Sequence, residues 1–224
     1  MNCFPVAKIH NGYASKFGIP KQSSIAKTII SEIVFEPEFR NPDAIRGLEG
    51  FSHLWLIWEF SESEPSRSLT VRPPGLGGNK RMGVFATRSP FRPNPIGLSC
   101  VEIAGIDYEC ENAPVIKVLS ADLMNGTPIL DIKPYLPQFD SKPEAAGGFS
   151  KDLAVNRFEV IIPEKLRLIY PDSFLSDVTA ILSNDPRPQY HNDPERIYGF
   201  VYDGREIKFR VFEHTVEVTD ISEV

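Results

Sequence analysis

Apolar residues in the first part of the chain occur in short runs that often alternate with polar ones, a pattern that predicts β-strands. Strands are expected at Phe4–Ile9, Ile25–Phe35, Ser52–Phe60, Ser99–Ile106, Pro114–Leu119 and Ile129–Ile132. The run SHLWLIWEF is almost continuously apolar, so we expect a central strand buried on both faces. A helical turn is expected over Pro42–Leu48, with Asn41 as its N-cap. Short strands joined by irregular loops favour a β-barrel or sandwich over a Rossmann fold.

The last third of the chain has a different pattern. The segment Gln138–Leu153 is small and polar, as is typical of a linker. The segment Asp172–Ser183 places its apolar residues on one helical face, and these are Phe174, Leu175, Val178, Ile181 and Leu182. Further strands are expected at Phe158–Ile162 and in a hairpin formed by Ile197–Tyr202 and Glu206–Val211. A small α+β domain is therefore expected after the linker.

These patterns together predict a mainly β protein. We expect an N-terminal β-barrel domain over residues 1–140, a linker over 141–155 and a small α+β C-terminal domain over 156–224. The composition, with 42% apolar and 24% charged residues, is ordinary for a soluble globular protein.

Neither a membrane span, nor export, nor a metal site is expected. No apolar run approaches the roughly 18 residues of a membrane helix, and the N-terminus lacks a signal-peptide pattern, so we expect a cytoplasmic protein. The three cysteines, Cys3, Cys100 and Cys110, form no CxxC pair, which argues against a disulfide framework. Four scattered histidines offer no metal-ligand spacing.

One segment runs against the net charge of −6, because Pro65–Val101 contains no acidic residue. Its cations are Arg67, Arg72, Lys80, Arg81, Arg88 and Arg92. Within it, Val71–Leu98 is rich in glycine and proline, and prolines stiffen a loop so that less entropy is lost on binding. We expect this segment to bind an anion such as a carboxylate or phosphate. The alternative is a rigid structural crossover whose arginines only face solvent.

Three other polar clusters are candidates for function. Lys21-Gln22-Ser23 lies in an early loop and Phe60-Ser61 at a strand end, and either could be an ordinary solvated turn. The third cluster, Asp185-Pro-Arg-Pro-Gln-Tyr190 with Arg196, could bind a ligand or could be a turn between helix and hairpin. No Walker loop, GxSxG or HExxH motif is present, and these spacings alone identify no reaction.

Four longer stretches taken together resemble one family. They are GLEGFSHLWLIWEF, VRPPGLGGNKRMGVFATRSPFRPNPIGLS, DLMNGTPILDIKPYLP and DPRPQY followed by RIYGF, and they resemble the TsaA/TrmO (YaeB-like) family. The resemblance implies a tRNA methyltransferase that moves a methyl group from S-adenosylmethionine to N6 of N6-threonylcarbamoyladenosine, next to the anticodon of threonine tRNA. It also implies a barrel that binds the cofactor, and a homodimer in which the C-terminal domain of one protomer completes the pocket of the other.

The resemblance carries site residues onto this sequence. The implied cofactor residues are Lys21, Gln22, Phe60, Ser61, Arg88, Leu98, Ser99, Asp122, Leu123, Met124, Asn125 and Gly126. The implied substrate and catalytic residues are Asp185, Arg187, Tyr190, Arg196 and Tyr198. Ser61 departs from the pattern, since relatives can carry histidine there.

The expected roles follow from the chemistry of the acceptor. We expect Arg187 or Arg196 to hold the threonyl carboxylate, and Asp185 to orient that arginine or to act as the base. The remaining cations Arg72, Lys80, Arg81 and Arg92 are expected to contact tRNA or the partner subunit. Two alternatives stay open, namely a non-catalytic module that binds S-adenosylmethionine or RNA, and the same fold methylating another acceptor.

Overall fold

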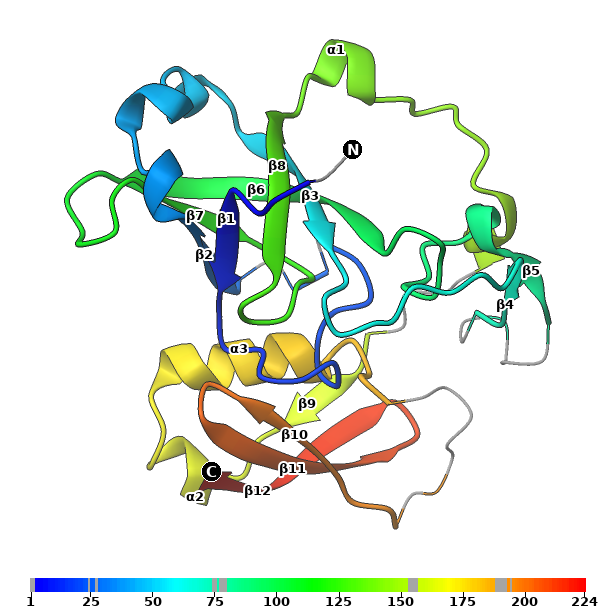
Figure 1. The fold of residues 1–224 in the computed structure, drawn as a ribbon. Coiled ribbons are helices and arrows are strands. Elements are labelled where there is room, and N and C mark those ends of the chain that lie inside the picture. Colours follow the sequence, from blue (N-terminus) through cyan, green and yellow to red (C-terminus); the bar gives the residue numbers. More distant parts are fainter. Residues whose placement is uncertain are drawn as a thin grey trace.

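A closed barrel of antiparallel strands forms the first part of the molecule in the computed structural model (Figure 1). The structure describes residues 3–23, 25–26, 28–73, 76, 80–152, 157–187, 193 and 195–224. The strand order around the barrel is β1-β2-β7-β6-β3-β8. The strands are β1 (Ala7–His10), β2 (Ile30–Phe35), β3 (His53–Glu59), β6 (Ile96–Asp107), β7 (Val115–Leu119) and β8 (Pro128–Pro134). The expected barrel is confirmed, and each expected strand overlaps an observed one.

Strand β3 shows how the barrel sorts its side chains. Leu54, Leu56 and Trp58 point into the barrel core, whereas the alternate residues of β3 are only half-buried on the outside. The expectation that this strand is buried on both faces is wrong. A closed barrel has one fully enclosed face, and the outer face of β3 is covered only in part.

Short helices and a two-stranded arm connect the barrel strands. Three 3₁₀-helices follow β2, and they are η1 (Pro37–Phe39), η2 (Pro42–Ile45) and η3 (Leu48–Gly50). The expected cap is confirmed, because the Asn41 side chain accepts a hydrogen bond of 2.9 Å from the amide of Asp43. Strands β4 (Thr70–Val71) and β5 (Met82–Gly83), followed by η5 (Val84–Ala86), form an arm that lies at the right of Figure 1, beside the barrel.

The C-terminal part is a four-stranded sheet with one long helix. The sheet order is β10-β11-β12-β9, and Figure 1 shows α3 between this sheet and the barrel. The elements are β9 (Glu159–Ile161), α2 (Glu164–Arg167), α3 (Asp172–Leu182), β10 (Tyr198–Tyr202), β11 (Arg205–Phe212) and β12 (Thr215–Glu223). All five apolar residues expected on one face of α3 are buried. Strand β12 was not expected, and it pairs with both β11 and β9.

The segment expected to be a linker has some regular structure of its own. Helix α1 (Pro137–Asp140) begins just after the barrel, and η6 (Gly148–Asp152) follows it. The limits of the expected domains at residues 140 and 156 stay a prediction. No helix in the described ranges is both long and apolar enough to cross a bilayer.

The barrel has a hydrophobic core of its own, and the segment between β1 and β2 joins the separate core of the C-terminal part. The core around α3 and the C-terminal sheet includes Tyr13, Ala26 and Ile29, which come from the segment between β1 and β2. Tyr13 also forms an isolated β-bridge with Tyr202 of β10, and the two rings are 5.4 Å apart. The loop after β1 therefore docks the barrel onto the C-terminal sheet.

Candidate cofactor and nucleotide site

A buried polar network lies where β3, β6 and the turn after β7 meet. The Ser99 hydroxyl donates to Oδ1 of Asp122 at 2.5 Å, and it accepts a hydrogen bond of 2.9 Å from the indole nitrogen of Trp58. Ser99 is 2% exposed, so its side chain is committed to this network. Two of the expected cofactor residues, Ser99 and Asp122, are thus brought together, although 23 positions separate them in the sequence.

The Lys21–Ser23 loop and Arg88 of the acid-free segment lie next to this network. Nη1 of Arg88 donates to Oε1 of Gln22 at 2.5 Å, and Lys21 accepts through its carbonyl from the Gln22 amide group at 2.6 Å. The backbone amide of Ser23 hydrogen-bonds the Asp122 carboxylate. Lys21, Gln22 and Arg88 themselves are exposed. The geometry is therefore consistent with the expectation that these two segments contribute to the same site as Asp122.

The environment of Asp122 makes it unusual among the carboxylates. Burial raises the pKa of the Asp122 carboxyl above its ordinary value, while the hydrogen bonds from Ser99 and from backbone amides and the charge of Arg88 lower it. The net direction is upward. A desolvated carboxylate of this kind interacts strongly with a cationic ligand group, because little water competes with it.

The end of β3 adds an aromatic side chain next to the network. Phe60 is half-buried and packs against Trp58 with ring centroids 4.2 Å apart. Its amide donates to the carbonyl of Pro95 at 2.7 Å, which ties the end of β3 to the start of β6. Ser61 is exposed directly after it. Leu98 lies on the outer face of β6 with 53% of its surface exposed.

The Asp122–Gly126 turn presents backbone rather than side chains at its centre. Leu123 is fully buried in the barrel core, so only its backbone can reach a ligand. Met124 is half-buried, whereas Asn125 and Gly126 are exposed. Gly126 has φ of 79°, a left-handed conformation that glycine adopts without steric cost.

A second cluster lies on the C-terminal part, directly after α3. The Arg187 guanidinium pairs with Asp185 through two hydrogen bonds, Nε to Oδ1 at 2.8 Å and Nη2 to Oδ2 at 3.0 Å. Asp185 has a positive φ of 43°, and its Oδ1 also accepts from the Arg187 amide at 3.3 Å. Burial acts to lower the pKa of Arg187, but the hydrogen bond and charge of Asp185 outweigh it and raise that pKa. The arginine is therefore held charged although it is 8% exposed.

Aromatic rings complete this second cluster. The Arg187 guanidinium carbon lies 5.9 Å from the ring centroids of both Phe158 and Tyr198. The guanidinium of Arg196, an exposed residue, lies 5.2 Å from the same Tyr198 ring. The structure thus brings together four of the five expected catalytic residues. The fifth, Tyr190, lies outside the described residues.

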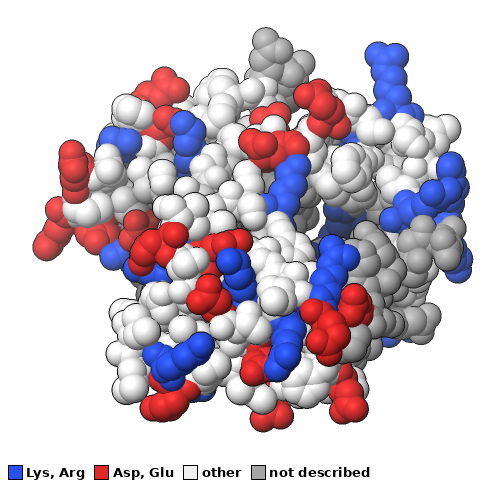
Figure 2. Space-filling view, turned by 90° about the horizontal axis from the view of Figure 1, so that it is seen from below, with Lys and Arg blue, Asp and Glu red and all other residues white. Residues whose placement is uncertain are grey.

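Charge is unevenly distributed over the surface. Figure 2 shows blue side chains gathered at the right edge, the side on which Figure 1 shows the β4–β5 arm, and red ones along the left edge. Arg67, Arg72, Lys80 and Arg81 of this arm are exposed. Within the part of the chain that the structure describes, the ion pairs involve other residues than the six cations of the acid-free segment.

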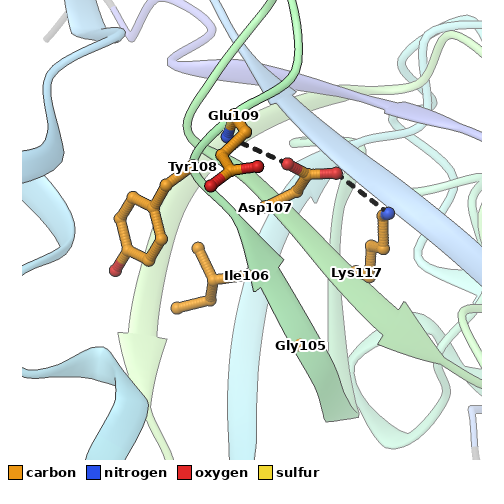
Figure 3. Close-up of a pocket in the computed structure, with 6 residues that line it drawn as sticks. All are labelled: Gly105, Ile106, Asp107, Tyr108, Glu109 and Lys117. Carbon is orange, nitrogen blue, oxygen red and sulfur yellow. Dashed lines mark hydrogen bonds and ion pairs between the residues drawn. The ribbon is translucent and has the colours of Figure 1, made fainter.

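A shallow pocket of about 340 Å³ lies at the far end of β6 (Figure 3). Its polar groups are paired with one another. Lys117 forms an ion pair of 3.1 Å with Asp107, Asp107 also accepts from the amide of Glu109, and the Tyr108 hydroxyl donates to Glu49. Lys117, Asp107 and Glu109 belong to the β6–β7 hairpin and Glu49 to η3, so we assign these contacts to the structure of the barrel. No group of three or more potential metal ligands occurs among the residues that the structure covers.

Known sequence families match both parts of this chain. The profile of the tRNA-methyltransferase O N-terminal domain matches residues 8–141, and that of the TrmO C-terminal domain matches residues 162–224. The chain belongs to the TrmO family. The resemblance expected from the four motifs is confirmed.

Individual proteins are similar to this chain, two of those described here over almost its whole length and one over a smaller part of it. A protein of Escherichia coli K12 named tRNA (adenine(37)-N6)-methyltransferase is 38% identical over 224 residues, which covers 95% of this chain and 94% of the relative. A probable S-adenosyl-L-methionine-binding protein of Pyrococcus abyssi is 37% identical over 62% of this chain and 71% of its own. The crystal structure of TrmO from Pseudomonas aeruginosa superposes with a TM-score of 0.79 at 29% identity, over 100% of this chain and 97% of that chain.

Sequence reasoning missed the groups that support the site. The apolar pattern predicts only a buried strand at Trp58, yet its indole donates to Ser99. Asn11 was not singled out, although its side chain contacts the Asp122–Gly126 turn. An asparagine before a glycine is a common turn signal, and this local pattern does not indicate a longer-range contact.

Proposed function

We propose that this chain is a tRNA methyltransferase that uses S-adenosylmethionine to methylate N6 of the adenosine at position 37, and that this adenosine carries an N6-threonylcarbamoyl group. The observation that carries the proposal is the similarity to the Escherichia coli tRNA (adenine(37)-N6)-methyltransferase, which spans 95% of this chain and both of its parts. A chain retaining only a cofactor-binding barrel would not need the Asp185–Arg187 cluster.

The barrel network fits the groups of S-adenosylmethionine. This cofactor, when bound, supplies a methyl group made electrophilic by a positive sulfonium. The desolvated carboxylate of Asp122 suits a cationic group or hydroxyls, Arg88 suits a carboxylate, and Phe60 offers an aromatic face. Lys21, Gln22, Ser61, Leu98 and the Leu123–Gly126 turn are proposed to line the same place. The similarity to a probable S-adenosyl-L-methionine-binding protein supports this assignment.

The Asp185–Arg187 cluster suits the modified nucleoside. The N6 nitrogen is a poor nucleophile until it loses its proton, because its lone pair is delocalised into the purine and the carbamoyl group. A fixed, charged Arg187 can hold the threonyl carboxylate, and its two bonds to Asp185 set the direction of the guanidinium. Tyr198 and Arg196 then offer a stacking surface and a further cation for neighbouring groups of the anticodon loop. Tyr190 is proposed for the same site.

The arm supplies the charge that a tRNA backbone requires. Arg67, Arg72, Lys80 and Arg81 are exposed on one side of an otherwise acidic molecule. Phosphate contacts of this type dominate affinity for nucleic acids and weaken with salt. We further propose that the protein acts as a homodimer in the cytoplasm, with the C-terminal part of one protomer completing the cofactor site of its partner.

Transfer of labelled methyl from S-adenosylmethionine to defined tRNAs tests the proposal. Threonine tRNA that carries the threonylcarbamoyl group at position 37 is expected to be methylated, whereas the same tRNA without that group is not. Equal methylation of both would show a different acceptor. Binding of S-adenosylmethionine without transfer to any tRNA would instead favour a non-catalytic binding module.

A further inference from the structure

One asparagine outside the expected site makes several contacts with the Asp122–Gly126 turn. Nδ2 of Asn11 donates to the carbonyl of Leu123 at 3.0 Å and to the Ser31 hydroxyl at 3.3 Å. The backbone amide of Asn11 donates to Oδ1 of Asn125 at 3.1 Å. The bonds to Leu123 and Asn125 join positions more than 110 residues apart in the sequence.

The neighbours of Asn11 hold the same turn through their backbones. The carbonyl of Tyr13 accepts from the amide of Asn125 at 2.9 Å, and the carbonyl of Ile9 accepts from the amide of Gly126 at 2.8 Å. Oδ1 of Asn11 accepts from the amide of Tyr13 at 3.0 Å, which fixes the chain between these two carbonyls. The turn is thus bound along one side by the segment Ile9–Tyr13.

The opposite side of this segment contacts the C-terminal part. The carbonyl of Gly12 accepts from the amide of Asp203 at 2.9 Å, and a side chain at Gly12 would place Cβ 2.6 Å from the Tyr202 ring. Tyr13 is 1% exposed and packs edge-on against Tyr202, whose hydroxyl donates to Asp177 of α3 at 2.8 Å. Figure 1 shows the chain after β1 passing from the barrel to α3 and the C-terminal sheet.

We propose that Asn11 is a positioning residue for the proposed cofactor site. Asn11 holds the Leu123–Gly126 backbone in the conformation that receives the cofactor. Through Tyr13 it also fixes the position of that backbone relative to the C-terminal part, which carries Arg187. The identity of the ligand in this inference rests on the proposed function. The contacts of Asn11 are independent of it.

Asn41 provides a matched control for a purely local role. Its side chain also accepts from the amide two residues on, Asp43, at 2.9 Å, so the local turn is the same as at Asn11. Asn41 is exposed and caps η2, and its contact is to η2 alone. Asn41→Ala therefore measures what loss of such a turn does by itself.

The test combines two variants of Asn11 with this control. Asn11→Ala removes every side-chain contact, whereas Asn11→Ser keeps a hydroxyl acceptor for the Tyr13 amide but is too short to reach the Leu123 carbonyl. For each protein we would measure amide hydrogen exchange at Asn125 and Gly126 without ligand, calorimetric affinity for S-adenosylmethionine, and kcat and KM for the cofactor.

Asn11→Ala is expected to speed exchange at both amides and to weaken S-adenosylmethionine binding about tenfold, the size of one lost hydrogen bond, raising KM more than it lowers kcat. Asn11→Ser should not recover the affinity that Asn11→Ala loses, and Asn41→Ala should leave exchange and affinity unchanged. Unchanged exchange and affinity in Asn11→Ala, or full recovery of affinity by serine, would overturn the proposal. If the wild-type protein did not bind S-adenosylmethionine, the proposed function would fail, while the exchange rates would still decide whether Asn11 holds the turn.

Discussion

The two polar clusters of this molecule are built in different ways. The Ser99–Asp122 network joins strands and a turn that are distant in the sequence, and its members are fixed by the barrel core around them. The Asp185–Arg187 pair joins residues two positions apart in an irregular segment after α3, where Asp185 has a positive φ. The first cluster depends on the whole barrel, whereas the centre of the second is a local ion pair with the Phe158 and Tyr198 rings packed against its arginine.

Because of this difference, substitutions in the two clusters are expected to affect different properties of the protein. Changes in the barrel network are expected to affect folding and cofactor binding together, because the same side chains are proposed to serve both. Changes at Arg187 are expected to affect the acceptor more than the cofactor, since Arg187 is proposed to hold the threonyl carboxylate and not a group of the cofactor. The following predictions test this separation, beginning with the largest effect.

Arg187→Ala is expected to lower kcat for methyl transfer to tRNA by roughly 100-fold or more, because alanine cannot pair with a carboxylate bidentately. Affinity for S-adenosylmethionine should change by less than about twofold, a free-energy difference below ~0.5 kcal/mol. Single-turnover kinetics and calorimetry measure the two quantities.

Two further variants make the Arg187 result interpretable. Arg187→Ala leaves Asp185 without its partner and can fold poorly for that reason. Arg187→Lys keeps the positive charge but cannot pair with a carboxylate bidentately, so its turnover on tRNA should still be strongly reduced. Arg210→Ala, which breaks an ion pair of 2.7 Å with Glu217 on the C-terminal sheet, should leave turnover unchanged. A loss of cofactor affinity in Arg187→Lys as large as its loss of turnover would contradict the division between the clusters.

Gly97→Ala is expected to destabilise the barrel by ~1–3 kcal/mol, because a side chain there would meet the Trp58 ring and force it to move. A Cβ at Gly97 would lie 2.2 Å from the indole, so Trp58 would also be displaced from Ser99. Urea unfolding measures the change. Gly105→Ala is the control in the same strand, since a Cβ there meets nothing within 4 Å. Equal effects of the two substitutions would show that the contact with Trp58 is unimportant.

Ser99→Ala is expected to cost ~1–2 kcal/mol of unfolding free energy, because it leaves the buried indole of Trp58 without its acceptor. It should also weaken S-adenosylmethionine binding, since Asp122 loses the hydroxyl that orients it. Ser99→Thr keeps the hydroxyl and should lose less affinity than alanine. If alanine reduced stability without any change in affinity, the network would be structural only.

The same contrast explains what the sequence could predict. Alternating apolar residues predicted the barrel strands and the buried face of α3 because such patterns are local. The neighbourhood of Asp185 and Arg187 was likewise visible, since only one residue separates them. The Trp58–Ser99 contact spans 41 positions and was not predictable, because no local pattern records which inward-facing residues meet across a barrel. Strand β12 was missed because its alternation breaks after Val218, where a β-bulge opposite Lys208 and Phe209 puts Ile221 instead of Asp220 on the buried face.

The smallest effect expected is a pH dependence of stability that arises from Asp122. Because burial raises its folded-state pKa above the ordinary 3.8, the folded protein takes up more protons than the unfolded chain between that value and the raised one. The stability of the wild-type protein relative to Asp122→Asn should therefore fall as pH rises through this window, by less than ~1.4 kcal/mol per pH unit.

Asp140 is the matched control with the opposite sign, since hydrogen bonds from the Leu136 amide and the Trp55 indole lower its pKa. Relative to Asp140→Asn, wild-type stability should rise with pH up to about the ordinary pKa of aspartate. Urea unfolding of the three proteins from pH 3 to pH 7 measures both slopes, and a rising slope for Asp122 would mean that its charge is stabilised, not penalised, in the fold.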